Sequence, residues 1–170
     1  YIDAGGITSF LIPDDCQKLP STNIQVRRGR SDVSIKVFES PHVIVTRGFS
    51  RCAYADFSVS FRSSVRGIHG PKNDRELLIF LSFYLRTALA QYYLFHTSSN
   101  WGVTRAEVHD QELLRLPFPF PDQCSQPQEA WRLVRESAKV FDHAITQLKE
   151  PLSNREDIIN EAQAGVRHSL

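Results

Sequence analysis

The chain has 170 residues, enough for one domain or for one domain with an appended helical segment. Apolar residues make up 41% of it, which excludes a disordered protein, and three widely spaced cysteines argue against a disulfide scaffold. The net charge is only +1, but residues 27–72 carry nine Lys or Arg against three Asp or Glu, a local excess of +6.

That basic excess indicates a polyanionic partner on one face, with an ordinary solvated basic surface as the alternative. The cysteine usage favours a reducing compartment. Because the chain contains no methionine, we expect it to be a piece of a longer protein, and a processed secreted protein is the alternative.

Strand patterns dominate the chain before residue 72. Val33–Phe38 alternates apolar and polar residues, which predicts a strand with one buried face. His42–Thr46 is a continuous apolar run rich in β-branched residues, which predicts a strand buried on both faces. Tyr54–Phe61 alternates again, and a turn is expected between Gly67 and Pro71. We therefore expect a β-rich first part.

The pattern then becomes helical. Asn73 and Glu76 have the spacing of a capping box, and Leu77–Phe95 is apolar on nearly every face. A stretch of nineteen residues is long enough to span a membrane. Arg86 near its middle would be costly there, so we expect a helix buried in a protein core, with its tyrosines packed inside.

The second half contains shorter elements and then two helices. Asp110 is expected to cap a short turn over Gln111–Leu114, and the alternating prolines of Leu116–Pro121 force an extended chain. A second capping box, formed by Ser125 and Gln128, predicts the start of a long helix.

This long helix carries apolar residues at alternating spacings of three and four, which predicts a seam for a partner helix in this chain or outside it. The seam consists of Trp131, Val134, Ala138, Phe141, Ile145 and Leu148. Pro151 should end the helix. Ser153 with Glu156 should then cap a shorter helix that carries Ile158, Ile159 and Ala162.

We find no catalytic motif in the sequence. Phosphate-cradling loops, nucleophile elbows and zinc-protease motifs are all missing. The carboxylates of Asp14 and Asp15, or of Asp32 with Lys36, do not have the spacing of a nuclease centre. We therefore expect no catalytic residue and no metal site, with an unrecognised Mg²⁺-dependent nuclease as an alternative.

The best candidate site is a set of basic and hydroxyl side chains at the strand ends and in the adjoining loops. Arginine forks suit phosphates and guanine edges, and serine hydroxyls can position a phosphate backbone. The predicted DNA-binding residues are Arg47, Arg51, Arg62, Ser63, Arg66, His69, Lys72 and Arg105. Dispersal of the arginines over opposite sides of the fold, or their pairing with acids from the helical part, would overturn this site.

Segments of residues 41–121 resemble, in order, the target-recognition regions of bacterial restriction-modification methyltransferases. Residues 41–48 (PHVIVTRG) resemble a PxVLIPRG strand, and residues 61–70 (FRSSVRGIHG) resemble the FRdSIxGIxG segment that follows it. Residues 77–95 are similar to the LLxFLxAYLNSxLAxYYLF helix. Residues 100–103 and 113–119 are similar to the WGVxR…LxxLPFP close. Type I specificity subunits, in which a recognition domain feeds a spacer helix, have a related order.

The resemblance implies an adenine-N6 DNA methyltransferase, with or without a fused endonuclease. The family's catalytic Asn/Asp-Pro-Pro-Tyr/Phe tetrapeptide and its S-adenosylmethionine loop are both missing from this sequence. Methyl transfer and S-adenosylmethionine binding would therefore belong to another part of the parent protein. This fragment would need no cofactor and would position the target adenine for that domain.

We thus expect an α+β fold in which a target-recognition-like domain (residues 1–124), braced by a buried helix, precedes a C-terminal helical segment (residues 125–170). The expected partners are double-stranded DNA and the methyltransferase domain of the parent chain, in the bacterial cytoplasm and without a membrane. The alternative is a non-catalytic protein-interaction module of a restriction-modification complex, in which the apolar helices bind the partner and the basic loops are incidental.

Overall fold

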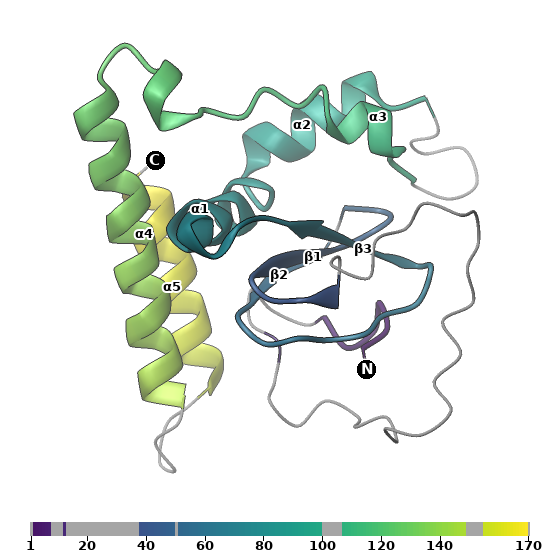
Figure 1. Cartoon of the computed structure of the whole chain (residues 1–170), viewed down its shortest axis with the longest axis horizontal. Helices are drawn as coiled ribbons and strands as arrows, with labels where there is room; N and C mark the ends of the chain where they lie inside the picture. The colour runs from purple at the N-terminus through teal and green to yellow at the C-terminus, as the bar shows by residue number, and fades with distance from the viewer. Residues whose placement is uncertain are drawn as a thin grey trace.

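The computed structural model describes residues 2–7, 12, 38–49, 51–99, 107–148 and 155–169, with the side chains of the last helix described over 157–165. In this part of the chain an antiparallel three-stranded sheet is combined with helices, which confirms the expected α+β class (Figure 1). The predicted strand up to Val37, the region 101–106 with Arg105, the cap at Ser153 and the carboxylates at 14, 15 and 32 lie outside the described residues.

The sheet has the order β2-β1-β3 and is centred on β1 (His42–Thr46). β1 pairs antiparallel with β2 (Cys52–Ala55) and with β3 (Val65–His69). All five residues of β1 are buried. The prediction of a strand covered on both faces is confirmed, because a central strand with a protein layer on each side needs apolar residues at successive positions.

Two predictions around β1 are wrong. The strand predicted over Tyr54–Phe61 begins earlier and ends at Ala55, although Phe57, Val59 and Phe61 still pack together in one apolar cluster. The turn predicted from Gly67 belongs to β3, where Gly67 pairs with Ile44. Glycine is a strong turn signal, but the pairing of β3 with β1 holds the backbone of Gly67 in an extended conformation.

Each face of the sheet is covered by a separate apolar cluster. Val43 and Val45 point to the face covered by the helices, while Ile44 points to the opposite face. On that opposite face Ile2, Ile7 and Ile12 of the N-terminal segment pack with Val59 and Val65. In Figure 1 this segment lies below the sheet, while the helices lie above it and on the left. The alternation along β1 thus separates two cores.

The single helix predicted over Leu77–Phe95 is two helices, α1 (Arg75–Tyr84) and α2 (Ala88–Thr97), which meet at a bend of 70°. Thr87 caps α2: its Oγ1 accepts from the backbone N–H of Ala90 at 3.2 Å and donates to the Tyr84 carbonyl at 2.7 Å. Arg86 donates to the carbonyl of Cys52 at 2.9 Å. Thr87 therefore satisfies helix backbone groups that a continuous helix would have paired, and Arg86 ties the break to β2.

The predicted capping box at Asn73 and Glu76 is also wrong. A 3₁₀ turn, η2 (Lys72–Asp74), leads into α1, and the residue at the N-cap is Asp74, which makes no side-chain capping bond. No single helix among the described residues is both long and apolar enough to cross a membrane, although α1 and α2 together pass that test as a bent pair.

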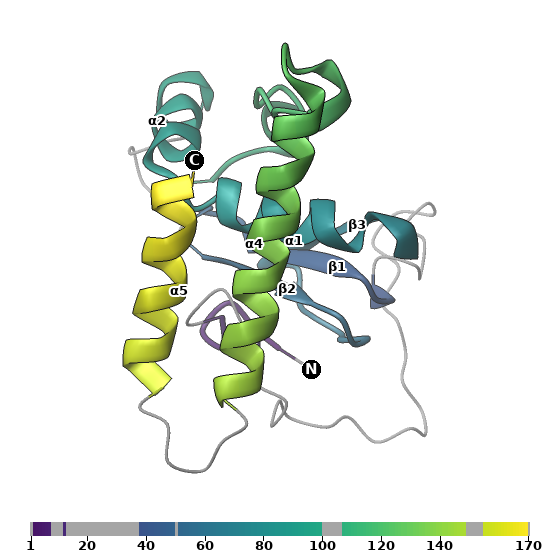
Figure 2. The same cartoon turned by 90° about the vertical axis from the view of Figure 1, so that its left-hand side faces the viewer.

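The second half begins with α3 (Asp110–Leu113), whose N-cap is His109, so the cap predicted at Asp110 is wrong by one residue. An extended stretch over Pro117–Phe120 follows, as predicted. A second 3₁₀ turn, η3 (Pro121–Gln123), precedes α4 (Pro127–Leu148) and α5 (Arg155–Ser169). Figure 2 shows α4 and α5 side by side and antiparallel. Both predicted C-terminal helices are confirmed.

The predicted apolar seam of α4 packs inside this chain. Val134, Ala138 and Phe141 are buried, and α4 contacts both α1 and α5. Phe141 also meets Tyr54 of β2 edge to face, with ring centroids 5.2 Å apart. The seam is thus occupied within the chain. Docking on a methyltransferase domain therefore stays a prediction only for the faces of α4 that do not carry this seam. The domain boundary between residues 124 and 125 also stays a prediction.

Candidate nucleic-acid interface

The strand register brings several of the predicted DNA-binding residues to one end of the sheet. Thr46, the last residue of β1, pairs with Val65, the first of β3, and Val45 pairs with Cys52, the first of β2. The residues next to these positions must therefore lie at the same end of the strands. We call this region the arginine end and define it by Arg47, Arg51, Arg62, Ser63 and Arg66.

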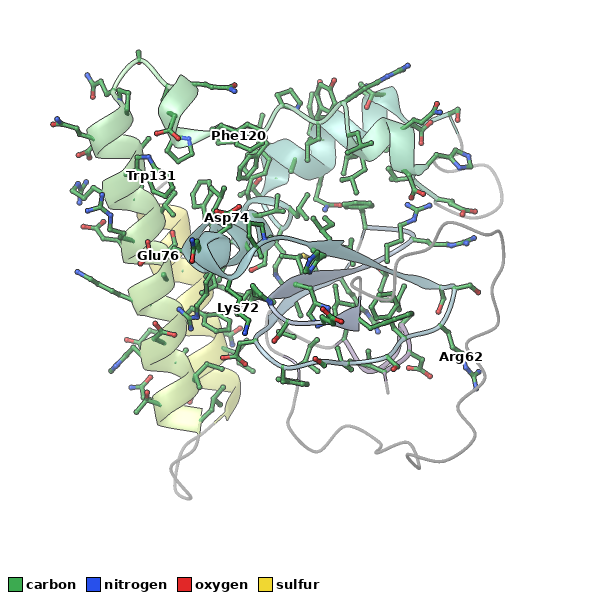
Figure 3. The ribbon with its side chains drawn as sticks, in the orientation of Figure 1. Arg62, Lys72, Asp74, Glu76, Phe120 and Trp131 are labelled. Atoms are coloured by element: carbon green, nitrogen blue, oxygen red, sulfur yellow. The ribbon has the colours of Figure 1, made fainter. Side chains whose placement is uncertain are left out.

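His69 and Lys72 do not belong to this group. His69 is at the last position of β3 and pairs with His42, the first residue of β1. His69 lies four residues further along β3 than Val65, which places the two about 13 Å apart. Figure 3 shows Arg62 at one side of the sheet and Lys72 at the other, beside α1. The predicted set is therefore split into two locations, and Arg105 lies outside the described residues.

Arg66 is held by acceptors from residues 107–110, at and just before the start of α3. Its Nε lies 2.8 Å from Asp110 Oδ1, its Nη2 lies 3.9 Å from Glu107 Oε1, and its Nη1 donates to the carbonyl of Val108. The side chain is 17% exposed. Arg66 pairs with Val45 across β1 and β3, so it projects from the helix-covered face, where residues 107–110 lie. The Arg66 side chain therefore stabilises the fold, and little of it is accessible to a ligand.

The backbone of Arg47 is bound within the fold, whereas part of its side chain is exposed to solvent. Its backbone N–H donates to the Ser64 carbonyl at 3.1 Å, and its own carbonyl accepts from Val108 at 3.0 Å. The side-chain Nη1 lies 3.0 Å from Glu107 Oε1, yet 43% of the side chain remains exposed. An exposed ion pair of this kind contributes only about 0–1 kcal/mol to stability, so a ligand can compete for this guanidinium.

The loops around the arginine end carry the remaining predicted residues on the surface. Arg51, Arg62 and Ser63 are all exposed. The Arg51 guanidinium donates to the carbonyl of Ala4 at 3.1 Å, and its backbone N–H donates to Thr46 Oγ1 at 3.3 Å. These bonds hold the β1–β2 turn against the N-terminal segment and leave a cation at its tip.

The arginine end keeps a positive charge after its ion pairs are counted. Four arginines face two acids, Glu107 and Asp110, so the described groups sum to +2. Pairing of the arginines with acids from the helical part is a result that would overturn the predicted DNA site. Arg47 and Arg66 are paired in this way, whereas the Arg51 guanidinium donates to the carbonyl of Ala4. The site is therefore narrower than predicted.

A second surface, on α2, was not predicted. Leu89, Tyr92 and Phe95 are 67%, 65% and 52% exposed, although the sequence placed the aromatic residues of this stretch in the core. Tyr84 and the half-buried Tyr93 do pack there. The 70° bend rotates α2 away from the direction of α1 and leaves one side uncovered (Figure 2). α2 contains no Lys, Arg, Asp or Glu. The exposed His96 contacts the rings of Tyr92 and Phe95, so this face is mainly apolar with one imidazole among its rings.

The described residues offer little for catalysis. They contain no group of three or more His, Cys, Asp or Glu side chains placed to hold a metal ion. Cys52 is fully buried, and this burial raises the pKa of its thiol to about 12, which makes it a poor nucleophile near neutral pH. Burial likewise raises the pKa of the Tyr54 hydroxyl to about 12.

No protein-family model, no curated protein and no solved structure matches this chain.

Proposed function

We propose that this chain is the DNA-recognition module of a bacterial restriction-modification adenine methyltransferase, acting in the cytoplasm, and that the arginine end contacts duplex DNA. The observation that carries the proposal is the convergence of Arg47, Arg51 and Arg62 on one end of the sheet, in loops set by the strand register. The ordered resemblance of residues 41–121 to target-recognition regions supports the same function.

The arginines would have different tasks. Arg51 and Arg62, both exposed, would neutralise phosphates, with Ser63 donating to a phosphate oxygen. Arg66, held by Asp110 and Val108, would keep the segment before α3 on the sheet. This division of tasks differs from the sequence-based expectation, in which Arg66 itself contacts DNA.

Methyl transfer would take place elsewhere. A methyltransferase domain of the parent protein would bind S-adenosylmethionine and receive the target adenine after it has been flipped out of the duplex. This chain would supply the choice of site and the register on the DNA. In this proposal it needs neither a cofactor nor a metal ion.

The test is a salt titration of binding to a fluorescent duplex of about 25 base pairs, followed by anisotropy. The double variant Arg51→Ala/Arg62→Ala should lower the slope of log Kobs against log salt by about 1.8, because each phosphate contact contributes about 0.9. Arg135→Ala/Lys139→Ala, which removes the same charge from exposed positions on α4, is the matched control. Equal slopes for the two double variants would contradict the proposal.

The exposed face of α2 favours a second candidate, the protein-interaction module. Tyr and Phe are enriched at the centres of protein interfaces, and three large apolar side chains point to solvent here. In this alternative Leu89, Tyr92 and Phe95 bind the methyltransferase domain of the parent protein. Because α2 contains no Lys, Arg, Asp or Glu, this binding should depend little on salt and should be lost in Tyr92→Ser/Phe95→Ser. DNA binding should fall steeply as salt is added.

A further inference from the structure

At the arginine end, a donor and an acceptor are presented together. Arg47 Nη1 lies 3.0 Å from Glu107 Oε1, and the two side chains are 43% and 26% exposed. Arg47 Nε is buried without a hydrogen-bond partner, so the groups that can reach a ligand at this end of the sheet are the terminal Nη groups of Arg47 and the carboxylate of Glu107. The pair therefore offers N–H groups and a carboxylate oxygen side by side.

The backbone holds the pair firmly in place. The N–H of Arg47 is bonded to the Ser64 carbonyl, and the Arg47 carbonyl is bonded to the N–H of Val108, the residue after Glu107. Glu107 also lies 3.9 Å from Arg66 Nη2, and Arg66 is fixed by Asp110 at 2.8 Å. Glu107 would thus keep a cationic neighbour if Arg47 turned toward a ligand.

This arrangement is a poor match for a phosphate. Phosphate oxygens only accept hydrogen bonds, so a phosphate that binds Arg47 brings its negative charge next to the carboxylate of Glu107. Two like charges held this close repel each other, and at an exposed site solvent and salt weaken this repulsion without removing it. A ligand that supplies both acceptors and a donor avoids this repulsion.

We infer that the Arg47–Glu107 pair reads a G·C base pair in the major groove. Arg47 would donate to the O6 and N7 acceptors of guanine, and Glu107 would accept from the N4 amino group of cytosine. An A·T pair also offers an acceptor and an amino group, but no base in it has the two adjacent acceptors that an arginine fork prefers. This inference rests on the proposed DNA-recognition function and adds the base pair that the site selects.

The experiment is selection from a randomised duplex library by the wild-type chain, by Glu107→Ala and by Glu136→Ala. Glu136 on α4 also pairs with an exposed arginine, Arg132, so its removal changes the net charge by the same amount. Wild type and Glu136→Ala should enrich sequences with one position fixed as G·C. Replacement of that base pair by A·T should weaken wild-type binding about tenfold or more.

Glu107→Ala should lose this preference, with less than a threefold difference between the two duplexes, and should bind random duplex more tightly than Glu136→Ala does. Arg47→Lys keeps the charge but lacks the fork, so it should lose the preference while the salt slope stays unchanged. Circular dichroism melts establish that each variant is folded.

Three results would overturn the inference or its premise. If wild-type binding to duplex DNA shows no salt dependence, the proposed function itself fails. If wild type binds DNA but Glu107→Ala keeps the same preferred base pair, only the reading by this pair fails. If Arg47→Lys retains the preference, arginine-specific recognition of guanine is excluded, and the proposed function stands.

Discussion

The packing of α4 on the rest of the chain can be tested with Phe141→Ala. Phe141 is 3% exposed and contacts the ring of Tyr54 across the junction between α4 and β2. Truncation removes its buried surface and leaves a cavity, which costs about 3–5 kcal/mol for a buried phenylalanine. For a chain of this length the loss corresponds to a fall in Tm of about 6–20 °C.

Urea denaturation followed by far-UV circular dichroism measures this change. Phe95→Ala is the matched control: it is the same substitution on α2, at a position that is 52% exposed. Its cost should be about 1 kcal/mol, because only about half of its surface is buried and truncation leaves no enclosed cavity.

A small loss for Phe141→Ala, comparable to that for Phe95→Ala, would refute the packing described here. It would mean that α4 does not share a core with the sheet and α1, and that its apolar seam is available to a partner outside the chain. A large loss would instead leave α2 as the apolar surface on which a partner can dock.

Three further predictions concern single side chains. Thr87→Ala removes the cap of α2 and should cost about 1 kcal/mol in urea denaturation; no loss would contradict a capped break between α1 and α2. In a Cys16→Ser background, a thiol reagent at pH 8 should modify Cys124 long before Cys52, whose pKa burial raises to about 12; equal rates would refute this. Backbone N–H groups of Ser99 and His109 lower the pKa of Glu112 to about 2, so its stabilising effect should be complete above about pH 4.5 and disappear as the pH falls toward 2. A carboxyl titration by NMR with an ordinary midpoint would contradict that assignment.

Elements with a strong local signal could be predicted from the sequence. The apolar run of His42–Thr46 forms a buried strand. The residues at three-four spacing in 131–148 lie on a packed helix. The alternating prolines of Leu116–Pro121 likewise gave an extended chain. In these segments the local pattern and the tertiary packing favour the same conformation.

Elements decided by distant contacts could not be predicted. Gly67 favours a turn locally, but pairing with Ile44 makes it part of an edge strand. The break between α1 and α2 depends on Arg86 reaching the carbonyl of Cys52 and on Gln91 reaching that of Phe49. The sequence shows that Arg86 and Gln91 interrupt this apolar stretch, but only the position of the β1–β2 hairpin shows which carbonyls they bind.

The candidate site was predicted in part. Arginines in loops that join antiparallel strands were expected to gather, and Arg47, Arg51 and Arg62 do so. The sequence did not show that Arg66 faces the segment 107–110, because the pattern predicts a turn from Gly67 to Pro71 and no strand over residues 65–69. Alternation along β3 would have placed Arg66 on the same face as Ile68, toward the helices.

The most direct test of the central claim is an NMR titration of the ¹⁵N-labelled chain with duplex DNA, which maps the contact surface residue by residue. If the arginine end binds DNA, the amide signals of Arg47, Arg51 and residues 62–64 should shift progressively, and those of Leu89–Phe95 on α2 should not. Shifts confined to α2 or to the pair α4 and α5, with the sheet loops unchanged, would contradict the account.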